Sequence, residues 1–125
     1  MGKLTTHVLD TARGRPGAGM RVELYALGSW SSADHGSEPS GRTLVASITT
    51  NADGRADHPL IEGDDFAAGT YELVFQAGEY FNSSGLADYP PFLGEIPIRF
   101  TVGPDGYYHV PLLVSPWSYT TYRGS

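Results

Sequence analysis

Apolar and polar residues alternate with a period of two along several segments of the chain, which is the pattern of half-buried β-strands. The alternation predicts four strands, at residues 20–27, 43–50, 70–76 and 95–102. In the last of these, Ile96 and Ile98 would share one face while Arg99 lies on the other. The pattern weakens after residue 76, and a short helix is expected over residues 78–83.

Two further predicted strands, at residues 4–10 and 107–115, break this alternation, and the second is substantially apolar on both faces. Such a sheet must be covered by something, and another subunit is the natural cover in a chain this short. His7 and His109 lie on the faces opposite the expected core, so we expect them at a subunit interface, where small-ligand sites often form. Pro111 cannot donate to a strand ladder, and we expect an irregularity there.

Turn signals separate the predicted strands. Asp53-Gly54 and Asp105-Gly106 supply the positive φ angles that tight turns need. The second pair predicts a hairpin joining the strand that ends near Val102 to the strand that begins near Tyr107. Residues 28–42 are rich in glycine and serine and are expected to form an exposed loop. Many short strands with such spacing indicate a β-sandwich.

Composition agrees with one all-β domain spanning residues 1–125, because the chain has 16 Gly and 9 Pro, which long helices tolerate poorly. A net charge of −6, scattered along the chain, argues against nucleic-acid binding. No apolar stretch approaches the roughly 18 residues of a membrane span. The first residues lack the features of a secretory signal, so we expect a soluble, cytoplasmic protein that does not bind membranes. Without cysteine, disulfides and thiol catalysis are excluded.

The chain has four histidines, and two of them are candidates for chemistry. His35 in the glycine-rich loop and His58 after a turn are expected to be solvated. His7 and His109 have three possible roles. Spacing alone favours hydrogen-bonded interface residues, while an acid/base pair with pKa values near the working pH is the catalytic alternative. A metal site lacks a third ligand at recognisable spacing, so no metal is expected.

Arg55 and the last residues of the chain carry weaker signals of function than the two histidines. Arg55 follows Asp53-Gly54 and is either a solvated turn residue or a guanidinium that binds a planar, anionic, oxygen-rich substrate. Residues 122–125 look like a tail that frays. No nucleophile elbow, phosphate loop or paired-glycine dinucleotide turn is present, so neither a serine-hydrolase triad nor a nucleotide cofactor is expected.

The two ends of the chain resemble one known family. Residues 4–16 read LTTHVLDTARGRP and resemble the opening signature of the transthyretin-like proteins, and residues 115–125 read SPWSYTTYRGS and resemble their ending. The similarity continues through TNADGR at 50–55 and EIPIRF at 95–100. This family contains a hormone carrier and a hydrolase that acts on 5-hydroxyisourate. The terminal Tyr-Arg-Gly-Ser, His7, His109 and Arg55 all match the hydrolase and are absent from the carrier.

The resemblance implies a transthyretin-like (prealbumin) β-sandwich of two four-stranded sheets with one short helix, assembled as a homotetramer (a dimer of dimers). It implies an active site between dimers that needs no cofactor, and hydrolytic opening of the six-membered ring of 5-hydroxyisourate in urate catabolism. One histidine would deprotonate the attacking water, and which one is left open. Arg55 would offset developing negative charge, and Ser125 with the terminal carboxylate would close the site. The residues implied at the site are His7, Arg55, His109, Tyr122, Arg123, Gly124 and Ser125.

Two alternatives stay open at this stage. The first is a transthyretin-like carrier that binds thyroid hormone or another planar aromatic ligand in the central channel. The second is a structural sandwich whose apolar sheet only holds an oligomer together. The family resemblance assigns no catalytic residue to the loops at residues 28–42 and 85–94, the second of which is longer than expected. The chain does not end in the peroxisomal Ser-Lys-Leu signal, which favours a bacterial cytoplasmic enzyme.

Overall fold

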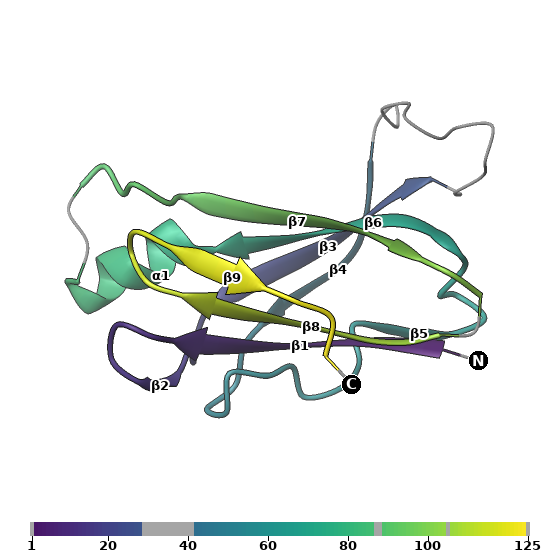
Figure 1. Cartoon of the computed structure of the whole chain (residues 1–125), viewed down its shortest axis with the longest axis horizontal. Helices are drawn as coiled ribbons and strands as arrows, with labels where there is room; N and C mark the ends of the chain where they lie inside the picture. The colour runs from purple at the N-terminus through teal and green to yellow at the C-terminus, as the bar shows by residue number, and fades with distance from the viewer. Residues whose placement is uncertain (1, 29–41, 87–88, 105, 125) are drawn as a thin grey trace.

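Two β-sheets pack face to face in the computed structural model of the chain (Figure 1). The structure describes residues 2–28, 42–86, 89–104 and 106–124. Its elements, in chain order, are β1 (Gly2–Asp10), β2 (Arg15–Pro16), β3 (Arg21–Gly28), β4 (Thr43–Thr49), β5 (Ile61–Gly63), β6 (Gly69–Gln76), α1 (Ala77–Ser84), β7 (Glu95–Val102), β8 (Tyr107–Val114) and β9 (Tyr119–Thr121). The six strands and the helix expected from the sequence are all present, with ends within two residues of the prediction.

The first sheet has the order β2-β1-β8-β9, and β5 also pairs with β1. The central pair, β1 and β8, is parallel, and the other pairs are antiparallel. β2 and β5 pair with opposite ends of β1, β5 at Gly2–Leu4 and β2 at Leu9 and Asp10. The expected sheet of four strands therefore has five, because two very short strands share one edge of β1.

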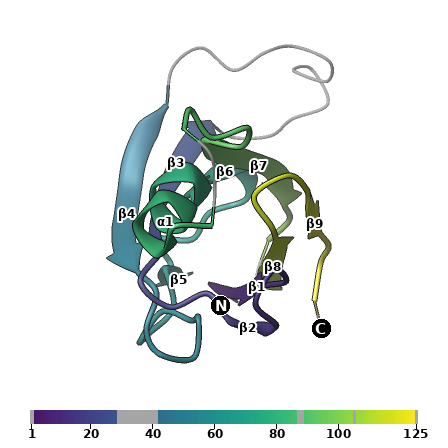
Figure 2. The ribbon, with the colours of Figure 1, turned by 90° about the vertical axis from the view of Figure 1, so that its left-hand side faces the viewer.

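The second sheet has the order β4-β3-β6-β7 and is antiparallel throughout. Figure 2 shows it as a separate layer from β1, β8 and β9, with α1 across one end of the sandwich. The two layers enclose the core, because every second residue of each strand points inward. Fully buried side chains come from both sheets and from α1; the largest are Phe75, Phe81, Leu4, Met20, Leu24, Leu73, Ile96 and Leu112. Each contributes on the order of 1.5–3 kcal/mol by leaving water.

The predicted hairpin between Val102 and Tyr107 is wrong. β7 pairs with β6 in the second sheet, whereas β8 pairs with β1 and β9 in the first. The turn therefore crosses the edge of the sandwich, where Gly103 donates its N–H to the Tyr108 hydroxyl at 2.9 Å. An Asp-Gly pair predicts that the chain reverses, but it carries no information about which sheet the next strand joins.

The irregularity expected at Pro111 occurs on one side of β8 only. The pairing with β1 runs without a shift from Lys3–Tyr107 to Asp10–Val114. On the other side, Leu112 pairs with Thr121 and His109 pairs with Gly124 in one antiparallel register, with Pro111 unpaired between them. The Thr121 hydroxyl donates to the Pro111 carbonyl oxygen at 2.8 Å, which replaces part of the ladder that proline interrupts.

The helix is fixed to the sandwich by a buried polar group. The Asp10 side chain is fully buried and accepts hydrogen bonds from the Tyr80 hydroxyl and the Arg13 Nε, both at 2.8 Å. Burial alone would raise the pKa of Asp10, but the bonds from Tyr80 and Arg13 outweigh it and hold the pKa below its ordinary value. This cluster joins the end of β1 to α1.

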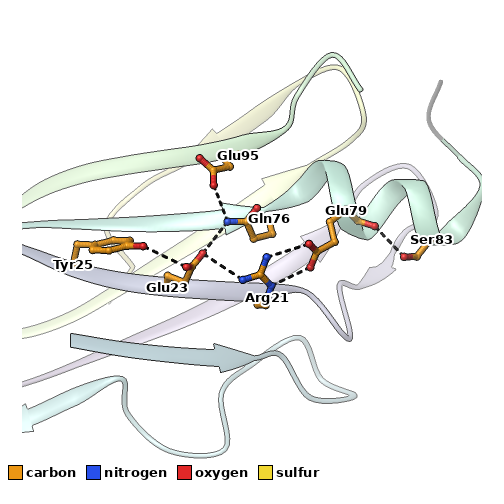
Figure 3. Close-up of polar contacts among 7 residues, drawn as sticks. All are labelled: Arg21, Glu23, Tyr25, Gln76, Glu79, Ser83 and Glu95. Carbon is orange, nitrogen blue, oxygen red and sulfur yellow. Dashed lines mark hydrogen bonds and ion pairs between the residues drawn. The ribbon is translucent and has the colours of Figure 1, made fainter. Parts of the chain in front are cut away.

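A network of polar side chains joins strands of the second sheet to one another and to α1 (Figure 3). Arg21 on β3 donates from Nε and Nη2 to the two carboxylate oxygens of Glu79 on α1, both at 3.1 Å. Gln76 donates to Glu23 at 2.8 Å and to Glu95 at 3.0 Å, so its amide joins β3, β6 and β7. These polar groups satisfy one another at the surface of this sheet.

Candidate active site

His7 and His109 lie on the outer face of the first sheet, on its two central strands. The parallel register pairs Thr5 with His109 and His7 with Pro111, which makes the two histidines diagonal neighbours. Both histidines are half-buried, whereas the intervening residues Thr6 and Val110 are buried in the sandwich. The structure thus brings the two histidines singled out in the sequence to one surface.

Arg55 reaches the same surface through the turn after β4. His7 and Arg55 form an antiparallel bridge, and Val8 donates its N–H to the Gly54 carbonyl oxygen at 2.8 Å. Gly54 has a φ of +77°, and a Cβ there would overlap the Val8 carbonyl oxygen. Glycine is therefore needed for the turn to approach β1 closely enough to place Arg55 beside His7.

Asn51 braces this turn from within. Its side-chain Oδ1 accepts the N–H groups of Asp53 at 2.9 Å and Arg55 at 3.1 Å. Its Nδ2 donates to the Asp57 carboxylate at 3.0 Å. This is the hydrogen-bonding pattern by which asparagine stabilises turns, and here it fixes the backbone that carries Arg55.

The C-terminal segment follows β8 beyond the end of β9 (Figure 1), contrary to the expectation that it frays. Gly124 forms a bridge with His109 and donates its N–H to the His109 carbonyl oxygen at 2.7 Å. A Cβ at Gly124 would lie 2.5 Å from Cδ2 of the His109 ring. Glycine is thus what lets the tail pass directly against the imidazole. Ser125 lies outside the described residues.

The tail side chains divide between the two faces of the sheet. The Arg123 guanidinium lies 4.1 Å from the centre of the Tyr108 ring, and its Nη2 donates to the Tyr107 carbonyl oxygen at 3.2 Å. Because successive residues of an extended segment point to opposite faces, Arg123 points away from the face of His109, whereas Tyr122 and Gly124 lie toward it. The structure therefore uses Arg123 as an anchor of the tail. Tyr122 is 57% exposed.

The electrostatic environment distinguishes His109. Partial burial lowers the pKa of His109, and the positive charge of Arg55 and the nearby His7 lower it further. His109 therefore favours its neutral form near neutral pH, and a neutral imidazole can accept a proton. Its Nδ1 lies 2.9 Å from the Thr5 Oγ1. Thr5 could not be identified from the sequence, because the register between β1 and β8 that puts it beside His109 cannot be read from either strand alone.

The remaining histidines do not join this site. His58 is exposed, as expected, with its Nδ1 3.2 Å from the Pro59 carbonyl oxygen. His35 lies outside the described residues. Within the described ranges, no three His, Asp or Glu side chains are arranged to hold a metal ion, and no helix has the length and apolar character to cross a membrane. What the surface offers is a neutral imidazole, a second imidazole, a guanidinium and exposed backbone of the tail.

Comparison with known proteins relates the whole chain to one family. Residues 4–124 match the HIUase/Transthyretin family. A relative from Rhizobium meliloti (strain 1021), named 5-hydroxyisourate hydrolase 2, is 54% identical over 127 aligned residues that cover 99% of this chain and 97% of the relative.

Solved structures agree on the fold. The (S)-allantoin synthase structure superposes with a TM-score of 0.84 at 48% identity, and this chain spans 99% of its own length but 44% of that chain. The 5-hydroxyisourate hydrolase of Klebsiella pneumoniae gives 0.76 at 30% identity, with both chains fully covered. Sea bream transthyretin in complex with thyroxine gives 0.81 at 27% identity, covering 98% of this chain and 94% of the other. Because a hydrolase and a carrier superpose about equally well, the fold does not separate the two activities.

Proposed function

The chain belongs to the HIUase/Transthyretin family, and from this premise we propose that it hydrolyses 5-hydroxyisourate. Water adds across one C–N bond of the six-membered ring, which opens to give 2-oxo-4-hydroxy-4-carboxy-5-ureidoimidazoline. The observation that carries the proposal is the meeting of His7, Arg55 and His109 on one sheet face, in a chain 54% identical to a named hydrolase. Water is the only co-substrate that this reaction needs.

His109 is the proposed general base. Its lowered pKa favours the neutral imidazole, which takes a proton from the attacking water as the new C–O bond forms. His109 can then pass the same proton to the nitrogen of the substrate ring when the C–N bond breaks. His7, on the neighbouring strand, orients the water or the substrate.

Arg55 is the proposed electrostatic partner of the substrate. Attack of water puts negative charge on the carbonyl oxygen and, after ring opening, on a carboxylate. A guanidinium held beside His7 by its own backbone bridge is in position to offset that charge. Because the chain carries a net charge of −6, attraction of an anionic substrate must come from such a local cation.

The tail is proposed to close the site. Gly124 binds the backbone of His109, and Arg123 holds the segment against Tyr108, so the chain beyond β9 lies along the edge of the catalytic face. Tyr122 and Ser125 are proposed to contact the substrate or its water from this segment, with Arg123 acting as their anchor.

The proposed assembly is a homotetramer, a dimer of dimers, with the outer face of the first sheet turned toward a second copy. This face carries half-buried Leu9 and Leu113 beside the histidines, and Tyr107 at its end is 68% exposed. An open sheet face would leave the substrate in bulk water on one side, whereas a facing copy would exclude water and strengthen each electrostatic contact. A cytoplasmic location is proposed as well, which suits a chain without cysteine.

The test uses the substrate itself, because 5-hydroxyisourate is unstable. Urate oxidase converts urate to it in the cuvette, and its ultraviolet absorbance is followed with and without the purified protein. Accelerated decay supports the hydrolase. Decay at the buffer rate contradicts it, and tight binding of thyroxine in the same preparation would then identify a carrier.

A further inference from the structure

The imidazole of His109 has one side-chain hydrogen-bond partner in the described part of the chain, the Thr5 hydroxyl, 2.9 Å from Nδ1. Thr5 lies on β1 directly opposite His109 in the parallel register, so both side chains leave the same face of the sheet side by side. The contact therefore follows from the pairing of the two central strands and needs no loop to adjust.

The opposite edge of the ring is also fixed. Gly124 packs against the Cδ2 edge, where an added Cβ would be 2.5 Å from Cδ2. A half-turn of the ring would exchange Nδ1 with Cδ2, removing the bond to Thr5 and placing a nitrogen against the backbone of the tail. Thr5 and Gly124 thus favour one ring orientation, which leaves Nε2 as the nitrogen without a bond to the described residues.

A neutral imidazole carries one proton, and its position decides whether Nε2 can act as a base. If Nδ1 holds the proton, Nε2 presents a lone pair; if Nε2 holds it, that nitrogen is a donor and cannot accept a proton from water. A threonine hydroxyl can accept from Nδ1–H while its own proton points to solvent or substrate, and Thr5 is half-exposed on this face.

We infer that Thr5 is a positioning residue for the hydrolysis: its hydroxyl accepts the Nδ1–H of His109 and so keeps the lone pair on Nε2, facing the water. This rests on the proposed function with His109 as base. His7, diagonal to it on β1, and Arg55, in the turn paired with β1, are the charged or titratable groups that act on the imidazole. Both groups disfavour a doubly protonated ring. Thr5 therefore acts on the balance between the two neutral tautomers, with the proton on Nδ1 or on Nε2.

The experiment compares Thr5→Val with Thr5→Ser in the full-length protein. Valine has nearly the same shape but no hydroxyl, and serine keeps the hydroxyl. We expect T5V to lower kcat about 10–100-fold, a part of the ~10²–10⁴ that general-base catalysis contributes, with little change in KM. T5S should stay within a few-fold of the wild type. Thr49→Val, at an exposed threonine on β4, is the matched control and should leave kcat unchanged.

A second measurement does not depend on turnover. Nitrogen-15 NMR of the imidazoles, with His109 assigned by its loss in His109→Gln, reports which ring nitrogen carries the proton. The wild type should show Nδ1–H for His109 above its pKa, and T5V should shift toward the Nε2–H form. An Nε2–H form in the wild type, or wild-type kcat in T5V, overturns the inference and leaves the hydrolase standing. A wild type that fails to accelerate substrate decay contradicts the proposed function instead.

Discussion

The N–H of Gly124 donates to the carbonyl oxygen of His109 at 2.7 Å, and this bond ties the end of the chain to the strand that carries the proposed base. The contact continues at the side-chain level, because the Gly124 backbone lies against the His109 ring. Arg123 secures the same segment by stacking on Tyr108. Residues 122–124 thus lie against the strand of the proposed base, although they form no regular strand.

Gly124→Ala tests this contact with one added carbon. A Cβ would be 2.5 Å from the His109 ring, so either the tail or the imidazole must move. We expect kcat to fall by about 10-fold or more, because small displacements of catalytic groups have large effects on rate. Gly94→Ala is the control, since a Cβ there meets nothing within 4 Å. Steady-state kinetics of the two variants should differ, while their thermal unfolding should not.

Deletion of residues 122–125 removes the whole segment. The large buried side chains of the core all precede it in the chain, so the deletion should leave the unfolding temperature nearly unchanged. The decay of the substrate should slow to the spontaneous rate. The reason is that the site loses the tail segment beside β8, including Gly124, which lies against the His109 ring. A deletion variant with full turnover would show that the tail has no catalytic role.

Much of this arrangement could be predicted from the sequence, and the failures share one cause. Period-two alternation located the six long strands, because it reports which residues each strand buries on its own. The pairing of strands is a property of two segments together. For that reason the sequence predicted a hairpin between β7 and β8, which belong to different sheets, and a fraying tail, which pairs with His109. The contact between Thr5 and His109 could not be predicted for the same reason, because it depends on the pairing of β1 with β8.

The family motifs indicate the site residues, which the alternation of apolar and polar positions cannot identify. His7, Arg55 and His109 were candidates with ordinary structural explanations until the motifs around them matched a known pattern. The structure then brings the three together through one parallel strand pair and one glycine turn. The role of Arg123 as an anchor was not predicted, because stacking on Tyr108 depends on which face of the sheet each tail residue occupies.

Replacement of Arg55 by glutamine should reduce kcat/KM by about 10²–10³, the range found when one preorganised oxyanion donor is lost. Glutamine keeps a polar N–H donor and removes the charge, but its side chain is shorter than that of arginine. Arg15→Gln is the matched control, because Arg15 is exposed on β2, away from the bridge between His7 and Arg55. Equal losses in both variants would point to overall charge in place of a local contact.

The pH dependence of kcat/KM should report His109. A base works only when unprotonated, so activity should rise with pH through the pKa of His109 in the free enzyme. Since burial and the neighbouring Arg55 and His7 lower that pKa, the midpoint should lie below the ordinary histidine value of about 6.5. Removing the Arg55 charge should move the midpoint to higher pH, and Arg15→Gln should not. A midpoint above 6.5 in the wild type would exclude His109 as the base.

Tyr80→Phe tests the buried cluster at the end of β1 independently of activity. It removes the hydrogen bond to the Asp10 carboxylate, and the free energy of unfolding near neutral pH should fall by about 1.5–3 kcal/mol. Because the pKa of Asp10 is lowered in the folded state, this stabilisation is present above the unfolded pKa of about 3.9 and is lost as the pH falls through the folded value. Urea unfolding at pH 7 and pH 3 should therefore show a smaller difference between wild type and variant at pH 3. Tyr89→Phe, at an exposed tyrosine, should have no effect at either pH.

One sheet face carrying His7, Arg55 and His109 is proposed to open the ring of 5-hydroxyisourate. The most direct test of this proposal is the first-order rate of ultraviolet decay of freshly generated substrate, measured with equal concentrations of the wild type and of the folded His7→Gln/His109→Gln double variant. We expect strong acceleration by the wild type and decay at the spontaneous rate with the double variant. Acceleration that survives the loss of both histidines would contradict it.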